Sequence, residues 1–83
     1  MSTSVYIDNF PAGTTIEDVR AEWERWEAPI LSVDPVEGGD ADKLAFIVKL
    51  DIDADTARIM ADRRRDWFFK GRRIGLFVAT PRE

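Results

Sequence analysis

The chain contains no cysteine and no histidine among its 83 residues. Without cysteine it has no disulfide, no thiolate metal site and no cysteine nucleophile, and it suits a reducing compartment. Without histidine it lacks the commonest general base and the commonest transition-metal ligand. No glycine-rich phosphate cradle stands beside a helix start. We therefore expect no enzymatic activity, no metal and no cofactor.

Long apolar stretches are also missing. No run approaches the roughly 18 residues of a membrane helix, and no charged segment followed by an apolar one marks a secretory signal. A chain of 83 residues makes one small domain, which must bury a large share of its apolar side chains to be stable. The sequence predicts a single soluble, cytoplasmic domain over residues 1–83 with no membrane partner.

The charge of the chain is unevenly distributed. The formal net charge is −4, but residues 1–42 carry −8 and residues 43–83 carry +4. Two interpretations stay open. The basic half forms a local positive surface on an acidic protein, or its charges are ordinary solvated groups on the helices.

The clearest strand pattern lies near the start of the chain, in VYIDNF at residues 5–10. An alternation with period two places Val5 and Ile7 on one face of a strand and Tyr6 and Asp8 on the other. We expect a central strand with one face on the core. Tyr6 then stands on open sheet as a binding platform.

Capping residues and apolar spacing predict a first helix. Thr14 or Thr15 can cap it, and Glu17 or Asp18 can complete a capping box. An amphipathic pattern continues for about three turns until Pro29 stops it.

Two tryptophans lie on the apolar stripe of this helix. An apolar stripe at helical spacing most often packs into a core. We assign Trp23 to the core and Trp26 to its edge.

A second helix is predicted in the other half. Asp51, Asp53 or Asp55 can cap it, and the basic run at 63–65 is typical of a helix C-terminus, where cations favour the negative end of the dipole.

The remaining extended segments are residues 30–36, an edge strand interrupted by Pro35, residues 43–50, a second central strand, and residues 74–80. With the two helices they give the order strand, helix, strand, strand, helix, strand. The predicted fold is an α+β, ferredoxin-like βαββαβ sandwich. Its four-stranded antiparallel sheet has the order 4-1-3-2, with both helices on one face.

The run at residues 5–10 resembles the hexamer motif of the RNA recognition motif family: aliphatic, aromatic, aliphatic, any residue, Asn, apolar. Residues 15–19 and 23–26 resemble the first helix of that family, and residues 69–74 resemble its approach to the last strand. The resemblance implies a small single-domain member that binds single-stranded RNA on its open sheet face.

The octamer motif of the family is degenerate here, in KLAFIVKL at residues 43–50. In one register Leu44 and Phe46 face outward beside Tyr6. In the other, Phe46 is core, and Ala45, Ile47 and Lys49 face outward. A slip of one residue exchanges the two faces. We favour the second register, because it keeps Lys49 in solvent.

The resemblance implies an RNA site made of aromatic stacking on Tyr6 and phosphate contacts from Lys and Arg. Phe77 either stands beside Tyr6, if the last strand pairs with the first, or belongs to the core. The candidate RNA-binding residues are Tyr6, Asp8, Lys43, Phe46, Ile47, Lys49, Arg72, Arg73, Phe77 and Arg82.

An alternative is open as well. The acidic composition and the poor octamer are compatible with a domain that has lost RNA binding and uses its open sheet face for a protein partner or a homodimer.

Overall fold

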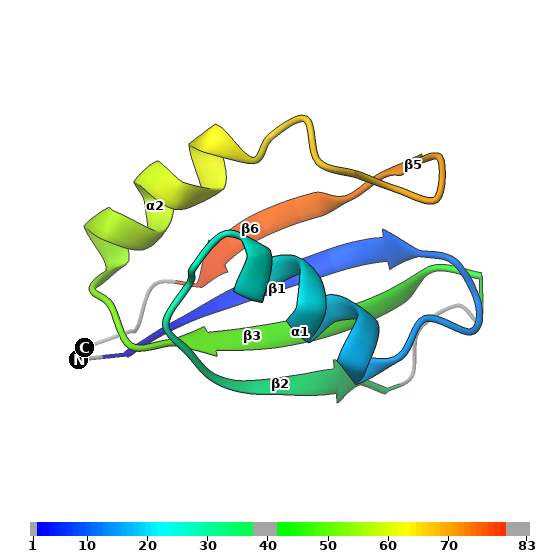
Figure 1. Ribbon diagram of the computed structural model, residues 1–83, viewed down its shortest axis with the longest axis horizontal. Helices are drawn as coiled ribbons and strands as arrows, with labels where there is room; N and C mark the ends of the chain where they lie inside the picture. The colour runs from blue at the N-terminus through cyan, green and yellow to red at the C-terminus, as the bar shows by residue number, and fades with distance from the viewer. Residues whose placement is uncertain (1, 38–41, 80–83) are drawn as a thin grey trace.

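The computed structural model describes residues 2–37 and 42–79. These residues form a mixed α+β domain with a four-stranded antiparallel sheet and two helices (Figure 1). The strand order is β2-β3-β1-β6, so the first strand and residues 44–50 are central, as predicted. The elements of this domain are β1 (Thr3–Phe10), α1 (Ile16–Arg25), β2 (Ile30–Val36), β3 (Leu44–Leu50), α2 (Ala54–Arg63) and β6 (Gly75–Ala79).

The predicted order 4-1-3-2 assumed four strands, whereas the described residues form six. The two additional strands, β4 (Phe68–Phe69) and β5 (Arg72–Arg73), pair as a separate small sheet between α2 and β6. Lys70 and Gly71 turn the chain between them with φ of 51° and 82°. Positive φ at both central residues is the geometry of a type I′ hairpin turn. Because of this hairpin, the last strand of the main sheet begins at Gly75 and not at residue 74.

Side chains cap the first free amides of both helices. The Thr15 hydroxyl accepts from the Asp18 amide at 3.1 Å, and the Thr15 amide donates to the Asp18 carboxylate at 3.0 Å, which completes a capping box. Asp53 accepts from the Thr56 amide at 2.9 Å. The structure thus selects one cap from each set of predicted alternatives.

These caps also lower the pKa of both carboxyl groups. The hydrogen bond from the Thr15 backbone holds the pKa of Asp18 below its ordinary value of 3.8. Hydrogen bonds from the Thr56 side chain and then from its backbone do the same for the pKa of Asp53. Both carboxylates lie at the starts of helices, so these two negative charges are on the helix side of the sheet.

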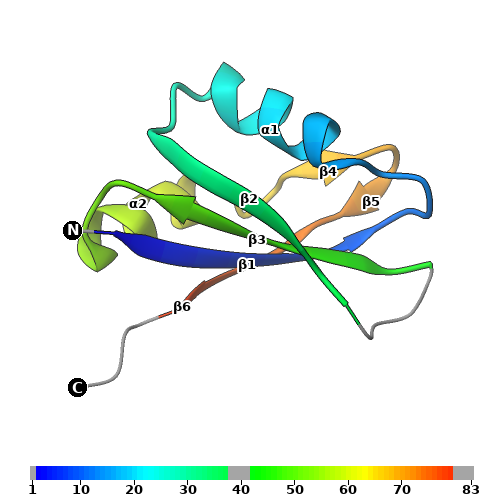
Figure 2. The same cartoon turned by 90° about the horizontal axis from the view of Figure 1, so that it is seen from below.

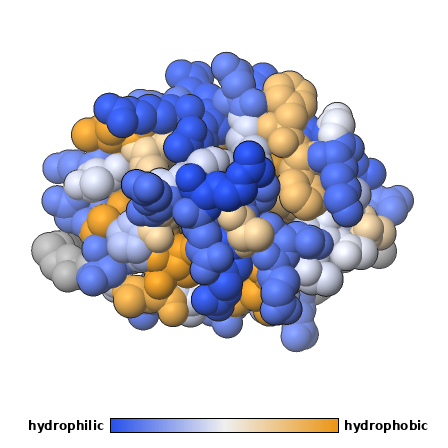
Figure 3. Space-filling view, in the orientation of Figure 1, coloured by the Kyte–Doolittle hydropathy of each residue, from blue (hydrophilic) through white to orange (hydrophobic). Residues whose placement is uncertain are grey.

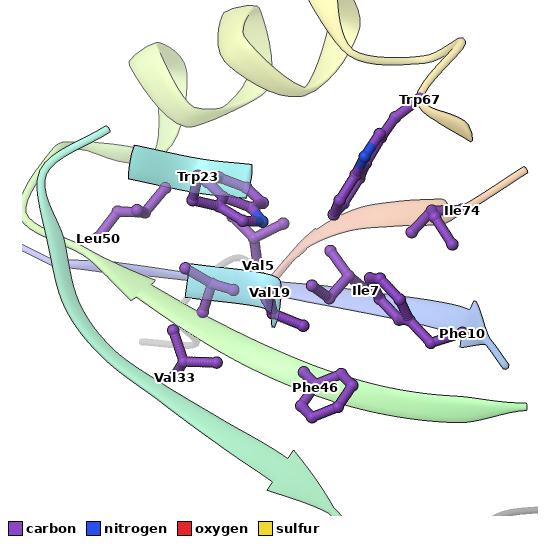
Figure 4. Close-up of a cluster of buried hydrophobic side chains, with 11 residues drawn as sticks. Val5, Ile7, Phe10, Val19, Trp23, Val33, Phe46, Leu50, Trp67 and Ile74 are labelled. Atoms are coloured by element: carbon purple, nitrogen blue, oxygen red, sulfur yellow. The ribbon is translucent and has the colours of Figure 1, made fainter. Parts of the chain in front are cut away.

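The hydrophobic core lies between the helices and one face of the sheet (Figures 1 and 4). Within this core the Phe10 ring packs edge to face against three others, with centroids 5.3 Å from Phe46, 5.5 Å from Trp67 and 5.4 Å from Phe69. The buried cluster consists of Val5, Ile7, Phe10, Val19, Trp23, Val33, Phe46, Val48, Leu50, Trp67 and Ile74.

Three tryptophans close the core at the helix side. Trp23 is buried and Trp26 is half-buried, as predicted. The Trp67 ring packs 4.8 Å from Trp26, and its indole N–H donates to Glu22 at 3.2 Å. The Arg64 guanidinium lies 4.6 Å from the centre of the Trp26 ring, so the C-terminal end of α2 is joined to α1 by a cation–π contact.

The end of β1 is irregular at Asn9. This residue has a φ of 75°, and the pairing of β1 with β3 shifts between Ile7 and Phe10. A bulge adds one residue to a strand and so changes which face the next side chain occupies. Phe10 therefore reaches the core although it lies three residues after Ile7. The Asn9 side chain also donates to the Arg73 carbonyl at 2.9 Å, which ties β1 to the small hairpin.

Candidate nucleic-acid interface

The second face of the sheet carries no helix within the described part of the chain (Figure 2). We call it the open face. A row of four side chains crosses it, because Ile47 is paired with both Asp34 and Tyr6, and Tyr6 is paired with Phe77. Residues that are directly opposite each other on antiparallel strands have adjacent side chains. The apolar part of this row runs over β3, β1 and β6.

Two aromatic rings lie next to each other in this row. The centroids of Tyr6 and Phe77 are 6.3 Å apart, with the rings tilted by 47°. Phe77 is 60% exposed, and Tyr6 is partly exposed. Of the two predicted placements for Phe77, the structure selects the one beside Tyr6, because β6 pairs with β1 and the Phe77 position alternates with the inward Leu76.

The register of β3 follows the second of the two predicted alternatives. Phe46 is 3% exposed and belongs to the core, whereas Ile47 is 37% exposed and Lys49 faces solvent. Including Phe46 among the candidate RNA contacts was therefore wrong, because a buried ring cannot stack on a base. The residue paired with Tyr6 on β3 is the aliphatic Ile47.

A surface depression of about 660 Å³ borders the Tyr6 ring on the side of the strand end. Gly75 forms part of its floor. Gly75 is paired with Asp8, and a Cβ atom at position 75 would overlap the Asp8 Oδ1 atom and lie 3.4 Å from Phe77 Cε2. The residues that line the depression are Tyr6, Asp8, Asn9, Lys43, Arg73, Ile74 and Gly75.

The predicted basic residues are only partly brought together. Lys43 lines the depression and Lys49 stands on the open face beside Ile47. Arg72 instead donates to the Asp42 carbonyl. Arg73 also lines the depression, but it donates from Nε to the Arg65 carbonyl at 3.3 Å and lies 3.8 Å from the Asp66 carboxylate, which holds its guanidinium at the small hairpin.

Arg82 lies outside the described residues. The open face as described therefore carries two lysines, Lys43 and Lys49, and two acids, Asp8 and Asp34. The opposite side of the molecule, where α1 lies, is largely hydrophilic with separate apolar patches (Figure 3). The open face is therefore not the local positive surface that one of the two interpretations of the basic half describes, because its two lysines are balanced by two acids within residues 2–37 and 42–79.

The described residues also lack two other kinds of feature. They contain no group of three or more acidic side chains that could hold a metal ion. None of their helices is long and apolar enough to cross a membrane. Comparison of the chain with protein-family models, with curated proteins and with solved structures finds no match.

Two residues of the open face were not singled out from the sequence. Asp34 enters the row only because β2 pairs with β3. Gly75 gives the Asp8 side chain its place. A glycine inside an apolar strand can indicate that another group approaches closely. Gly75, in IGLFV at residues 74–78, was therefore the sequence feature from which this close contact could have been predicted.

Proposed function

We propose that this chain binds single-stranded RNA across the open face, with Tyr6 and Phe77 as stacking anchors. The observation that carries the proposal is the adjacent pair of rings on the paired strands β1 and β6, of which Phe77 is exposed and Tyr6 is partly exposed. Bases of any identity stack on such rings, each contact contributing about 1–3 kcal/mol. Ile47 extends the apolar surface on the other side of Tyr6.

The sequence resemblance to the RNA recognition motif family supports the same proposal, and with it a ferredoxin-like βαββαβ arrangement. Ala45 and Ile47 occupy the outward octamer positions, where the family usually has aromatic residues. The missing rings reduce the number of bases that can stack. We therefore propose a short and modest RNA contact on Tyr6 and Phe77, with Lys43 and Lys49 serving the phosphates.

The test compares three aromatic-to-alanine variants in a titration with a degenerate single-stranded RNA pool, monitored by amide chemical shifts. Tyr6→Ala and Phe77→Ala should each weaken binding about tenfold, because each removes one stacking contact. Phe68→Ala is the matched control, since Phe68 is also 60% exposed but lies on the small β4–β5 hairpin.

The variant spectra identify which surface binds. Shifts in wild type should cluster on β1, β3 and β6, and Phe68→Ala should bind like wild type. The stacking model would be refuted if Tyr6→Ala bound RNA as tightly as wild type, or if the chemical-shift changes were confined to the β4–β5 hairpin.

A second candidate function is self-association through the open face. The observation that favours it is the balanced charge around an apolar centre: Lys43 and Lys49 with Asp8 and Asp34. A two-fold related copy can pair opposite charges across such a face. Sedimentation at rising protein concentration and at two salt concentrations distinguishes the two. RNA binding weakens steeply with salt. Self-association needs no RNA, and although salt screens its charge pairs, the contact between the apolar centres persists.

A further inference from the structure

We propose that the open face reads guanine, through the Asp8 carboxylate at the edge of the Tyr6 ring. This inference rests on the proposed RNA-binding function and adds a base preference to it. It is carried by four features of the same place: a carboxylate with no partner among the described residues, an adjacent aromatic ring, a glycine that makes room, and a depression next to them.

Asp8 stands next to Tyr6 on the open face. The two residues are separated by one position on β1, and both are in regular register with β6, where they are paired with Gly75 and Phe77. Side chains two residues apart on a strand share a face and lie roughly 7 Å apart. A base stacked on the Tyr6 ring therefore brings one of its edges within reach of the Asp8 carboxylate.

The Asp8 carboxylate has no hydrogen-bond or ion-pair partner within residues 2–37 and 42–79. It is partly buried all the same, because it lies over the backbone of Gly75. Any larger residue at position 75 would displace it. The oxygens of this carboxylate are thus positioned on the open face and free to accept hydrogen bonds.

The depression beside Asp8 has room for a planar base. Its volume of about 660 Å³ is within the range of small-ligand sites. Tyr6, Asn9 and Lys43 line the depression, so the Lys43 ammonium can approach the phosphate of a base bound there. A base can therefore stack on Tyr6 while its edge meets the Asp8 carboxylate and its phosphate meets the Lys43 ammonium.

The chemistry of a carboxylate selects among the four bases. An ionised carboxylate only accepts, through two oxygens that can take two parallel donors. The Watson–Crick edge of guanine presents two neighbouring donors, N1–H and the 2-amino group. Adenine and cytosine each offer one amino group next to an acceptor, and uracil offers one N–H between two acceptors. Guanine is the base that can satisfy both oxygens.

An acidic side chain on an RNA-binding face also disfavours the other bases. The carboxylate repels phosphate, and it loses hydration when a base covers it. A base with a single donor satisfies only one of its two oxygens and places an acceptor against the other. Asp8 thus lowers the affinity for sequences without guanine at this position. We therefore expect a clear preference for guanine even though the overall affinity for RNA is modest.

The test measures binding of the full chain to a short uridine-only RNA and to versions with guanine, inosine, adenine or cytosine at the central position. Guanine should bind about tenfold tighter than the other standard bases, as a good bidentate contact provides. Inosine lacks the 2-amino group and should lose most of this advantage. The RNAs are otherwise identical, so the phosphate contribution cancels.

Two variants remove the proposed contact, and a third serves as control. Asp8→Asn keeps the shape of the side chain but replaces one acceptor with a donor, and it should abolish the preference for guanine. Gly75→Ala should do the same by displacing the carboxylate. Asp34→Asn removes the other acid of the open face and should change binding to all the RNAs equally. Circular dichroism checks that each variant folds.

The outcomes separate this inference from the function on which it rests. If wild type binds none of the RNAs, the proposed function itself is wrong. If all RNAs bind alike, or if Asp8→Asn keeps a full preference for guanine, RNA binding stands and the role of Asp8 is refuted. A guanine preference that disappears in Asp8→Asn and survives in Asp34→Asn supports the assignment.

Discussion

The two faces of the sheet are made from alternate residues of the same strands, yet they differ in burial, in apolar character and in charge. On β3, Phe46 and Val48 point into the core, whereas Ile47 and Lys49 face outward. The covered face is a continuous apolar surface whose aromatic rings pack edge to face. Within the described residues, the open face has one adjacent pair of rings, Tyr6 and Phe77, with two lysines and two acids around it.

The difference between the faces shows which side chains are used for folding and which are available for binding. Phe10 and Phe77 are the same residue type, but Phe10 is fully buried while Phe77 is 60% exposed. Burial of a ring against other apolar groups stabilises the fold. An exposed ring contributes little to stability until a ligand covers it. Substitutions on the two faces should therefore affect different measurements.

The largest effect is expected from two neighbouring substitutions on β3. Phe46→Ala should lower the free energy of unfolding by about 3–5 kcal/mol, because it leaves a cavity in the core. Ile47→Ala should lower it by at most about 1 kcal/mol, since the side chain faces solvent and only strand preference is lost. Urea unfolding of the two variants measures this difference. Equal losses would contradict the register described for β3.

A gain of binding is expected when the open face is made more aromatic. Ile47→Phe adds a ring next to Tyr6 and should tighten RNA binding about tenfold, the contribution of one stacked base. Its stability should stay within about 0.5 kcal/mol of wild type, as is usual for surface substitutions. Fluorescence anisotropy with a short single-stranded RNA measures the affinity. An unchanged or weaker affinity would show that bases do not pass over β3.

The smallest expected effect is a loss of stability at low pH. It comes from the carboxylates that cap the two helices, and not from either face of the sheet. The pKa values of Asp18 and Asp53 are lowered by their capping hydrogen bonds in the folded protein. The unfolded chain therefore binds more protons in acid. The stability from these caps is complete above the ordinary pKa and is lost as the pH falls through the lowered one.

Asp53→Asn tests this pH dependence. Asparagine caps a helix about as well as aspartate but carries no charge to interact with the dipole. Wild type should be slightly more stable than the variant at neutral pH, and the gap in urea unfolding should close in strong acid. A gap that is independent of pH would show that the charge of the cap does not contribute.

Much of the fold can be predicted from local patterns. The alternation in residues 5–10 correctly separates Val5 and Ile7 from Tyr6, and helical spacing correctly places Trp23 in the core and Trp26 at its edge. Capping chemistry predicts both helix starts, with a few alternatives each. These features depend on residues close in sequence, where one pattern allows few geometries.

The candidate site is predicted less well. Tyr6 and Ile47 can be assigned to the open face from alternation, but the place of Phe77 depends on which strand β6 joins. Arg73 is a reasonable phosphate ligand in the sequence, yet the β4–β5 hairpin holds it near Asp66. The place of Phe77 depends on pairing with a strand about 70 positions away, whereas that of Arg73 depends on contacts within residues 65–73.

By itself, the sequence determined the α+β composition, the helix caps and the inward or outward direction of most strand residues, because these follow from local periodicity and hydrogen bonding. The tertiary structure alone decided that Tyr6 and Phe77 are neighbours, that the bulge at Asn9 returns Phe10 to the core, and that Gly75 leaves space for Asp8. Strand pairing joins residues about 70 positions apart, and no local pattern specifies which strand lies beside which.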